Sequence, residues 1–143
     1  MVQLHAATDV ADLKRLREER PGLRIVKSLI VNSDSCDELA DEVERFAPWV
    51  DAFITDTYDL ATGASGATGK THDWSVSRRL VRVSPRPIVL AGGLNPGNVR
   101  AAIAAVRPAG VDVQTGIEGP DGRKRRDLTE QFVAEAQAGF ARG

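Results

Sequence analysis

PIVLAGGLNPGNVRAAIAAVRPAGVDVQT, residues 87–115, is the stretch that decides the fold class. The apolar run at 87–91 ends in two glycines and predicts a buried strand. Asn95 and Pro96 then predict a helix N-cap with proline at the first helical position, and apolar residues spaced four and three apart continue that helix. The run at 110–115 predicts a second strand. Because a helix joins the two strands, they run parallel, and the stretch predicts a parallel sheet.

The same alternation of strand and helix extends to both sides of this stretch. Further strands are predicted at Val2–His5, Arg24–Val31 and Val50–Asp56. Further helices are predicted from about Asp9 to Arg20, after a capping box at Ser35–Glu38, after an N-cap at Asp73, and from Leu128 to Phe140. A long loop of Gly, Thr, Ala and Ser covers residues 59–72.

Five βα units in a row predict an α/β fold with a parallel sheet, a (βα)5 unit in a single domain over residues 1–143. On spacing alone two architectures remain open. One is an open, doubly wound sheet, and the other is part of an eight-stranded barrel.

Composition excludes several function classes. Nineteen Lys and Arg residues balance twenty Asp and Glu residues, and the net charge of −1 gives no electrostatic footprint for nucleic acid or an anionic membrane. Cys36 is the single cysteine, so the chain forms no internal disulfide. We find neither an apolar run long enough for a transmembrane helix nor the pattern of a secretory signal. We therefore expect a cytoplasmic protein with no nucleic-acid or membrane partner.

Polar residues interrupt the predicted strands. Lys27 lies inside one apolar run, Asp56 ends another, Asp112 stands between two valines, and Gln3 and His5 lie on the first strand. An unpaired buried charge is costly, so these residues require partners, water or a ligand. His5, Asp56 and Asp112 fall late in their strands, at the edge where α/β proteins bind ligands. The simpler interpretation is that Lys27 and one carboxylate form a buried pair that only fixes packing.

Glycines follow the predicted strands. Gly63–Lys70 follows the third strand, Gly92 and Gly93 follow the fourth, and Gly116 follows the fifth. Glycine lets backbone N–H groups approach an anion closely. In eight-stranded barrels the loops after the last two strands commonly hold a phosphate, which would make Gly92, Gly93 and Gly116 a phosphate site. The alternative is that they are ordinary turn glycines.

Three other signals are weak. Residues 64–71 resemble a nucleotide-binding P-loop with Ala in place of the first Gly, but a P-loop follows its strand directly, and this one starts eight residues after Asp56. An NTPase is therefore disfavoured. His5 and His72 are not spaced as metal ligands, so no metal site is predicted. A helix N-terminus can favour a thiolate at Cys36, but a small, partly buried residue is the simpler interpretation.

Six segments of the chain resemble, in the same order, segments of phosphoribosylanthranilate isomerases. They are VQLH (2–5), DT (56–57), GATGKTHDW (66–74), LAGGLNP (90–96), VRP (106–108) and VDVQTGIE (111–118). The likeness covers essentially the whole chain. It implies a (β/α)8 barrel of tryptophan biosynthesis that performs an Amadori rearrangement, turning an aminoaldose phosphate into an aminoketose phosphate without cofactor or metal.

The resemblance also implies a set of site residues. Asp56 corresponds to the general acid that protonates the furanose ring oxygen and so opens the ring. Asp112 corresponds to a pocket residue that contacts the substrate, and His5 lines the same mouth. The phosphate-binding loops of the family correspond to Gly92, Gly93 and Gly116.

The chain also departs from the family pattern. The likeness begins at the family's fourth strand, so the first three βα units have no counterpart. With them go the catalytic cysteine that acts as general base and an arginine that helps to hold the anthranilate. Cys36 does not occupy that cysteine's position, and Gln114–Thr115 stands where the family usually has two small hydroxyl residues.

We therefore expect a partial barrel with a phosphosugar substrate and very poor turnover by this chain alone. Five strands cannot close a barrel, because strand number, tilt and shear are linked, and open edges favour pairing between chains. A homo-oligomer through these edges is expected. The alternative function is a non-catalytic, self-associating barrel remnant that binds at most a phosphosugar.

Overall fold

The computed structural model describes residues 1–5, 7–31, 36–59, 64–65 and 73–141. Its strands are β1 (Val2–Leu4), β2 (Ile25–Val31), β3 (Ala52–Asp59), β4 (Ala64–Ser65), β5 (Ile88–Leu90) and β6 (Gly110–Val111). Its helices are α1 (Val10–Glu19), α2 (Cys36–Phe46), α3 (Trp74–Val83), α4 (Val99–Val106) and α5 (Arg126–Phe140), with a 3-10 turn at Thr115–Ile117. Within the described residues, none of the helices is long and apolar enough to cross a membrane.

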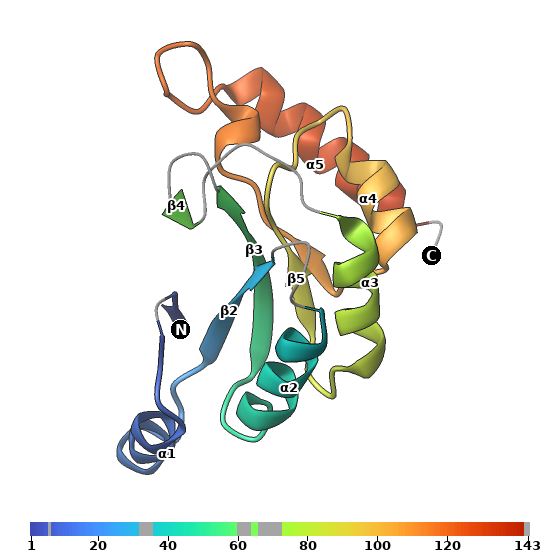
Figure 1. Cartoon of the computed structure of the whole chain (residues 1–143). Coiled ribbons are helices and arrows are strands. Elements are labelled where there is room, and N and C mark those ends of the chain that lie inside the picture. The colour runs from blue at the N-terminus through green and yellow to red at the C-terminus, as the bar shows by residue number, and fades with distance from the viewer. Residues whose placement is uncertain (6, 32–35, 60–63, 66–72, 142–143) are drawn as a thin grey trace.

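The strands form a parallel sheet in chain order. The order is β1-β2-β3-β5-β6, each neighbouring pair is parallel, and β4 pairs antiparallel with the end of β3. Figure 1 shows α3, α4 and α5 following one another beside the sheet, and α2 packs against α3, α3 against α4 and α4 against α5. The α/β class with a parallel sheet is confirmed. The order does not reverse as a doubly wound sheet requires, so that alternative is wrong for the described strands.

The two faces of the sheet differ in burial. Ile25, Leu29 and Phe53 point toward the helices and are completely buried. The alternate residues share the opposite face, as strand geometry requires. This face, called the open face below, carries Gln3, Val26, Ser28, Ile30, Ala52, Ile54, Asp56 and Val89. Val26, Ile30 and Val89 are only half-buried on it, so the two faces have unequal cover.

The buried lysine belongs to the helix side of the sheet. Lys27 donates from Nζ to the Ser28 carbonyl at 2.8 Å, lies 3.4 Å from a carboxylate oxygen of Glu42 on α2, and sits over the Phe46 ring. Lys27 is therefore paired with a carboxylate, as its simpler interpretation predicted, and the partner Glu42 on α2 is 26% exposed. Gln3 is also paired, because its side-chain amide donates to the Ser28 hydroxyl at 3.1 Å.

The sequence predicts the N-cap Asp73 correctly and one helix start wrongly, and Asp9, expected near the start of the first helix, is its N-cap. Asp9 and Asp73 each accept a hydrogen bond from the backbone N–H two residues on, at 2.9 and 2.8 Å. The helix predicted from Asn95 begins instead at Val99. Asn95 Oδ1 accepts from the Gly97 N–H at 2.8 Å, which stabilises a turn before the helix. Ser35 of the predicted capping box lies outside the described residues.

Two strand predictions are also wrong in their bounds. The strand predicted over 110–115 is limited to Gly110–Val111, because the backbone turns into the 3-10 helix at Thr115–Ile117. Asp112 therefore follows its strand, although its N–H still donates to the Leu90 carbonyl at 2.9 Å. The third strand runs beyond Asp56 to Asp59, so the loop predicted over 59–72 contains part of a hairpin.

Candidate functional site

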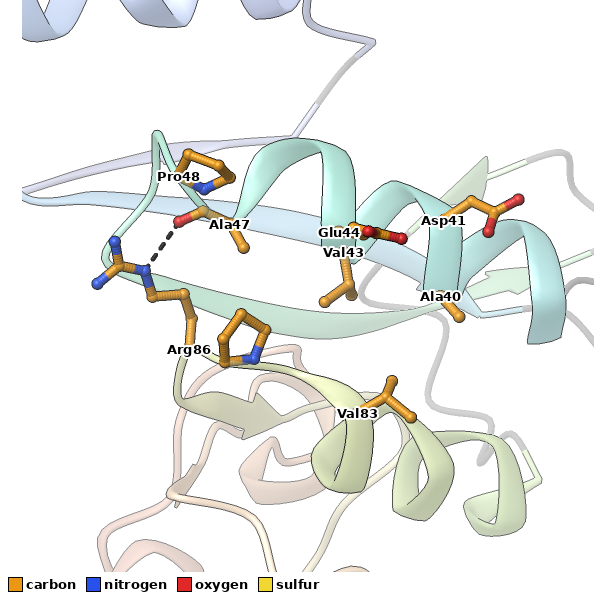
Figure 2. A pocket seen from close by; sticks show the side chains of 9 residues that line it. Ala40, Asp41, Val43, Glu44, Ala47, Pro48, Val83 and Arg86 are labelled. Atoms are coloured by element: carbon orange, nitrogen blue, oxygen red, sulfur yellow. Dashed lines mark hydrogen bonds between the residues drawn. The ribbon is translucent and has the colours of Figure 1, made fainter.

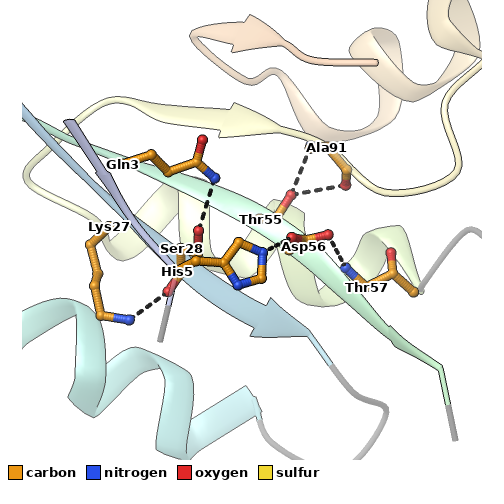
Figure 3. Close-up of polar contacts among 8 residues, drawn as sticks. All are labelled: Gln3, His5, Lys27, Ser28, Thr55, Asp56, Thr57 and Ala91. Atoms are coloured by element: carbon orange, nitrogen blue, oxygen red, sulfur yellow. Dashed lines mark hydrogen bonds and ion pairs between the residues drawn. The ribbon is translucent and has the colours of Figure 1, made fainter. Parts of the chain in front are cut away.

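His5 and Asp56, two of the predicted site residues, are in direct contact. Asp56 projects from β3, on the open face, and His5 directly follows β1. The His5 Nε2 and Asp56 Oδ2 atoms are 2.8 Å apart, and Asp56 Oδ1 accepts from the Thr57 N–H at 2.8 Å (Figure 3). The Asp56 side chain is only 14% exposed, whereas that of His5 is 43% exposed. The carboxylate is thus held from both oxygens, with the imidazole on its solvent side.

Asp112, the third predicted carboxylate, interacts electrostatically with Asp56. It lies just past β6, and the residue as a whole is exposed. Partial burial raises the pKa of Asp112, the charge of Asp56 raises it further, and Lys124 opposes both. The Lys124 ammonium is held by the Gln114 carbonyl and by Glu118 at 2.6 Å. Two carboxylates that repel each other across one end of a sheet are typical of a functional site.

The raised pKa of Asp112 gives a testable prediction about stability. The folded chain binds this proton more tightly than the unfolded chain, so the ionised Asp112 destabilises the fold at neutral pH. The penalty disappears as the pH falls through the raised value toward about 4, the ordinary carboxyl range. Asp112→Asn is therefore expected to melt at a higher temperature than the parent at pH 7, with a smaller difference at pH 4.

Thermal unfolding followed by circular dichroism at both pH values measures this effect. Asp41→Asn, a change of the same charge on the exposed surface of α2, is the matched control and should show no such pH-dependent gain. A melting temperature of Asp112→Asn below that of the parent at pH 7 would contradict the prediction.

The predicted phosphate glycines lie in two loops that touch. Gly92 and Gly93, which follow β5 after Ala91, have φ angles of 97° and 64°, a region that favours glycine. A Cβ on Gly116 would stand 1.8 Å from the Leu94 carbonyl oxygen, so the two backbones approach too closely for any side chain. The loops after β5 and β6 are therefore in close backbone contact at Gly116 and Leu94.

Two polar residues that the sequence did not single out hold these loops. Asn98 donates from Nδ2 to the Gly93 carbonyl at 3.0 Å and accepts from the Asn95 N–H at 2.8 Å. Thr55 is completely buried, and its hydroxyl contacts both the N–H and the carbonyl of Ala91, at 3.0 and 3.2 Å (Figure 3). Two sequence signals could have identified them. Thr55 is a threonine inside an apolar strand, and Asn98 is a second asparagine three residues after Asn95.

Other predicted features do not join this site. Cys36 begins α2, where it is partly buried against the apolar core, as its simpler interpretation predicted. His72 and most of the P-loop-like segment, Lys70 included, lie outside the described residues. Among the described residues we find no group of three or more His, Cys, Asp or Glu that could hold a metal.

A groove between α2 and α3 lies on the helix side of the sheet, away from the open face (Figure 2). It encloses about 560 Å³ and includes Val83, which is 50% exposed. Arg86 closes one end by donating from Nε to the Ala47 carbonyl at 2.8 Å. None of the predicted site residues lines it.

Comparison with known proteins identifies the family of the chain. Residues 1–135 match the family model of N-(5'-phosphoribosyl)anthranilate isomerase. The chain is 40% identical over 139 residues to N-(5'-phosphoribosyl)anthranilate isomerase 2 of Methanosarcina mazei, a match that covers 97% of the chain and 60% of that protein. It is also 40% identical over 143 residues to the isomerase of Haloferax volcanii, covering 100% of the chain and 59% of that protein.

Solved structures give the same result. Phosphoribosylanthranilate isomerase from Thermotoga maritima superposes with a TM-score of 0.74 at 31% identity, over 96% of this chain and 61% of that chain. An isomerase of this kind in complex with reduced 1-(o-carboxyphenylamino)-1-deoxyribulose 5-phosphate has a TM-score of 0.72 at 28% identity, over 96% and 59% of the two chains. The chain thus spans about three fifths of the length of these relatives.

Proposed function

The chain belongs to the N-(5'-phosphoribosyl)anthranilate isomerase family, and from this premise we propose that it supplies the general acid and the phosphate-binding loops of an isomerase barrel. The observation that carries the proposal is the contact between His5 and Asp56, which orients a largely buried carboxylate at one end of a parallel sheet. In parallel α/β folds this is the end where catalysis takes place.

The reaction converts an aminoaldose phosphate into an aminoketose phosphate. We assign the first step to Asp56, which transfers its proton to the furanose ring oxygen as the C1–O bond breaks. This opens the ring and leaves a protonated imine at C1. A general base then removes the C2 proton, and the resulting enolamine rearranges to the ketone. His5 orients Asp56 through the 2.8 Å contact, and Asp112 contacts the substrate beside it.

The substrate phosphate is assigned to Gly92, Gly93 and Gly116. Their loops contact each other through the backbone, and we propose that the N–H groups of these glycines donate to the phosphate oxygens. A phosphate accepts strong, charge-assisted hydrogen bonds from such donors. No metal or cofactor is required by the proposed steps.

We propose that the whole fold is one domain, the (βα)5 part of a (β/α)8 barrel. Support comes from the strand order, which follows the chain, and from helices that pack in the same sequence beside the sheet. The general base and the anthranilate-binding arginine of the family are assigned to the βα units that this chain does not match. We therefore expect the 143-residue chain alone to isomerise its substrate very poorly.

Binding separates this proposal from its alternatives. Isothermal titration of the chain with reduced 1-(o-carboxyphenylamino)-1-deoxyribulose 5-phosphate, the compound bound by a related isomerase, is expected to show binding that inorganic phosphate competes away. The same compound without its phosphate is expected to bind at least about tenfold more weakly, because charge-assisted hydrogen bonds are lost.

Equal affinity for the two compounds, or no binding by the folded chain, would contradict the proposal. Rapid turnover by the chain alone would instead show that it contains its own general base. The self-associating, non-catalytic alternative predicts binding without any turnover, even after the barrel is completed. Tight ATP binding that is lost in Lys70→Ala would favour the NTPase.

A further inference from the structure

The groove between α2 and α3 exposes apolar side chains that neither helix covers. Val43 and Ala47 line it and are buried, whereas Val83 on α3 is 50% exposed, and Pro48 and Pro85 at its end are also exposed. Figure 2 shows Val43 and Val83 pointing toward each other from the two helices. An exposed apolar strip that is bordered by polar residues is typical of a surface that binds another protein.

The two sides of this groove carry opposite charges. On α2, Asp37, Asp41 and Glu44 are spaced four and three residues apart, so they share one side of the helix, and all three are exposed. We call these three residues the acidic wall. On α3 every charged residue is an exposed arginine, and together they form the basic wall: Arg78, Arg79 and Arg82.

Contacts within the chain pair only part of these charges. Asp37 and Arg79 form an ion pair of 2.6 Å between the two helices. Among the residues that the structure describes, we find no ion pair of Asp41, Glu44 or Arg82. Isolated charges on an exposed surface contribute little to the stability of a fold, so these three are available to a partner.

The contact between Asp37 and Arg79 shows which parts of the two helices lie at the same height. Both helices join parallel strands of one sheet, so they run in the same direction. About one turn further toward the C-terminal ends, Asp41 on α2 and Arg82 on α3 therefore lie level with each other. Val83 follows Arg82 and lies at the same height.

A second copy of this chain is the partner whose charges match these walls. A two-fold axis that runs along the groove places α2 of one copy opposite α3 of the other, at the same height. Asp41 of each copy then faces Arg82 of the other, and both Val83 side chains enter the shared groove. An axis that runs across the groove instead places acidic wall against acidic wall, and such like-charge contacts are costly. The charges thus select one arrangement.

We propose that the groove between α2 and α3 is the interface of a two-fold symmetric dimer, in which the acidic wall of each copy binds the basic wall of the other. One surface carries both halves of each charge pair, and such self-complementarity is what an interface between identical copies requires. The interface differs from the sheet edges expected from the sequence. It also lies away from His5, Asp56 and Asp112, so it does not depend on the proposed function.

Charge reversal in the full 143-residue chain tests this interface by sedimentation equilibrium. The parent is expected to dimerise, and Asp41→Arg or Arg82→Asp should each raise the dissociation constant of the dimer at least about tenfold, because two attractive contacts become repulsive. An equimolar mixture of the two variants should recover a 1:1 heterodimer of near-parental affinity, because each reversed charge then meets its opposite. A folding defect in either variant would not be repaired by mixing.

Glu18→Arg on α1 is the matched control, a reversal at an exposed position outside the groove, and it should keep the parental dissociation constant. Raising the salt concentration from about 0.05 M to about 0.5 M should weaken the parental dimer, since exposed ion pairs are screened.

A monomeric parent would overturn the proposal. Association that neither reversal weakens would also overturn it and would assign self-association to the sheet edges. Two weakened variants that stay apart on mixing would show that the walls do not face each other. The measurement needs no substrate, so each of these outcomes leaves the proposed isomerase chemistry untouched.

Discussion

Asp56→Asn is expected to slow isomerisation about 10²–10⁴-fold, the range attributed to a general acid. Its affinity for reduced 1-(o-carboxyphenylamino)-1-deoxyribulose 5-phosphate, called the reduced analogue below, should change little. The asparagine keeps the size of the side chain, and its single oxygen can still accept from either the Thr57 N–H or His5 Nε2, but it has no proton to transfer to the ring oxygen. The measurement is steady-state turnover of phosphoribosylanthranilate by a fusion that joins the unmatched part of the M. mazei isomerase to this chain.

The fusion completes the barrel covalently, so the result does not depend on docking between separate chains. Asp41→Asn on α2 is the control with the same change of charge, and it should keep parental turnover. His5→Gln should fall between the two, because it alters how Asp56 is held without removing the carboxyl group. Turnover of Asp56→Asn within about threefold of the parent would show that another group supplies the proton.

Gly116→Ala is expected to separate the two loops of the phosphate site. The new Cβ would stand 1.8 Å from the Leu94 carbonyl oxygen and 2.9 Å from the Asn95 Cβ, and the first of these contacts is with backbone. One loop must move, which costs about 1–3 kcal/mol of stability by overpacking. The dissociation constant of the reduced analogue should rise about 10–100-fold, the loss of one or two charge-assisted hydrogen bonds.

Gly22→Ala is the matched control, since a Cβ at Gly22 meets nothing within 4 Å. Calorimetry for binding and thermal unfolding for stability should both leave Gly22→Ala close to the parent. If Gly116→Ala binds the analogue with parental affinity, the phosphate is held elsewhere.

Part of this structure follows from the sequence, because local patterns determine it. Apolar runs predicted β2 and β5, and the helices between them predicted that the strands are parallel. Asp73 was identified as an N-cap because an aspartate before a helix commonly has that role. His5 and Asp56 were expected at the same edge of the sheet because both fall late in their predicted strands, and the structure brings them into contact.

Other features depend on contacts between distant segments. β6 stops at Val111 although the apolar pattern continues, because the following residues turn toward Leu94 and bring Gly116 against its carbonyl. Asn98 resembled an ordinary helix residue, and only the fold shows that it holds the Gly93 carbonyl. Burial of Thr55 against Ala91 joins residues 36 positions apart, which no local pattern could indicate.

The pairing of Lys27 with Glu42 has a consequence for how β2 finds its place. Ile25, Leu29 and Val31 alternate with Val26 and Ile30, so aliphatic residues occupy both faces and hydrophobicity alone would tolerate a shift of one residue. Such a slip would turn Lys27 away from Glu42 and onto the open face. An uncompensated charge among aliphatic side chains is strongly unfavourable. This ion pair therefore helps to fix the register of β2 between its neighbours. It also determines which side chains of β2 lie on the open face.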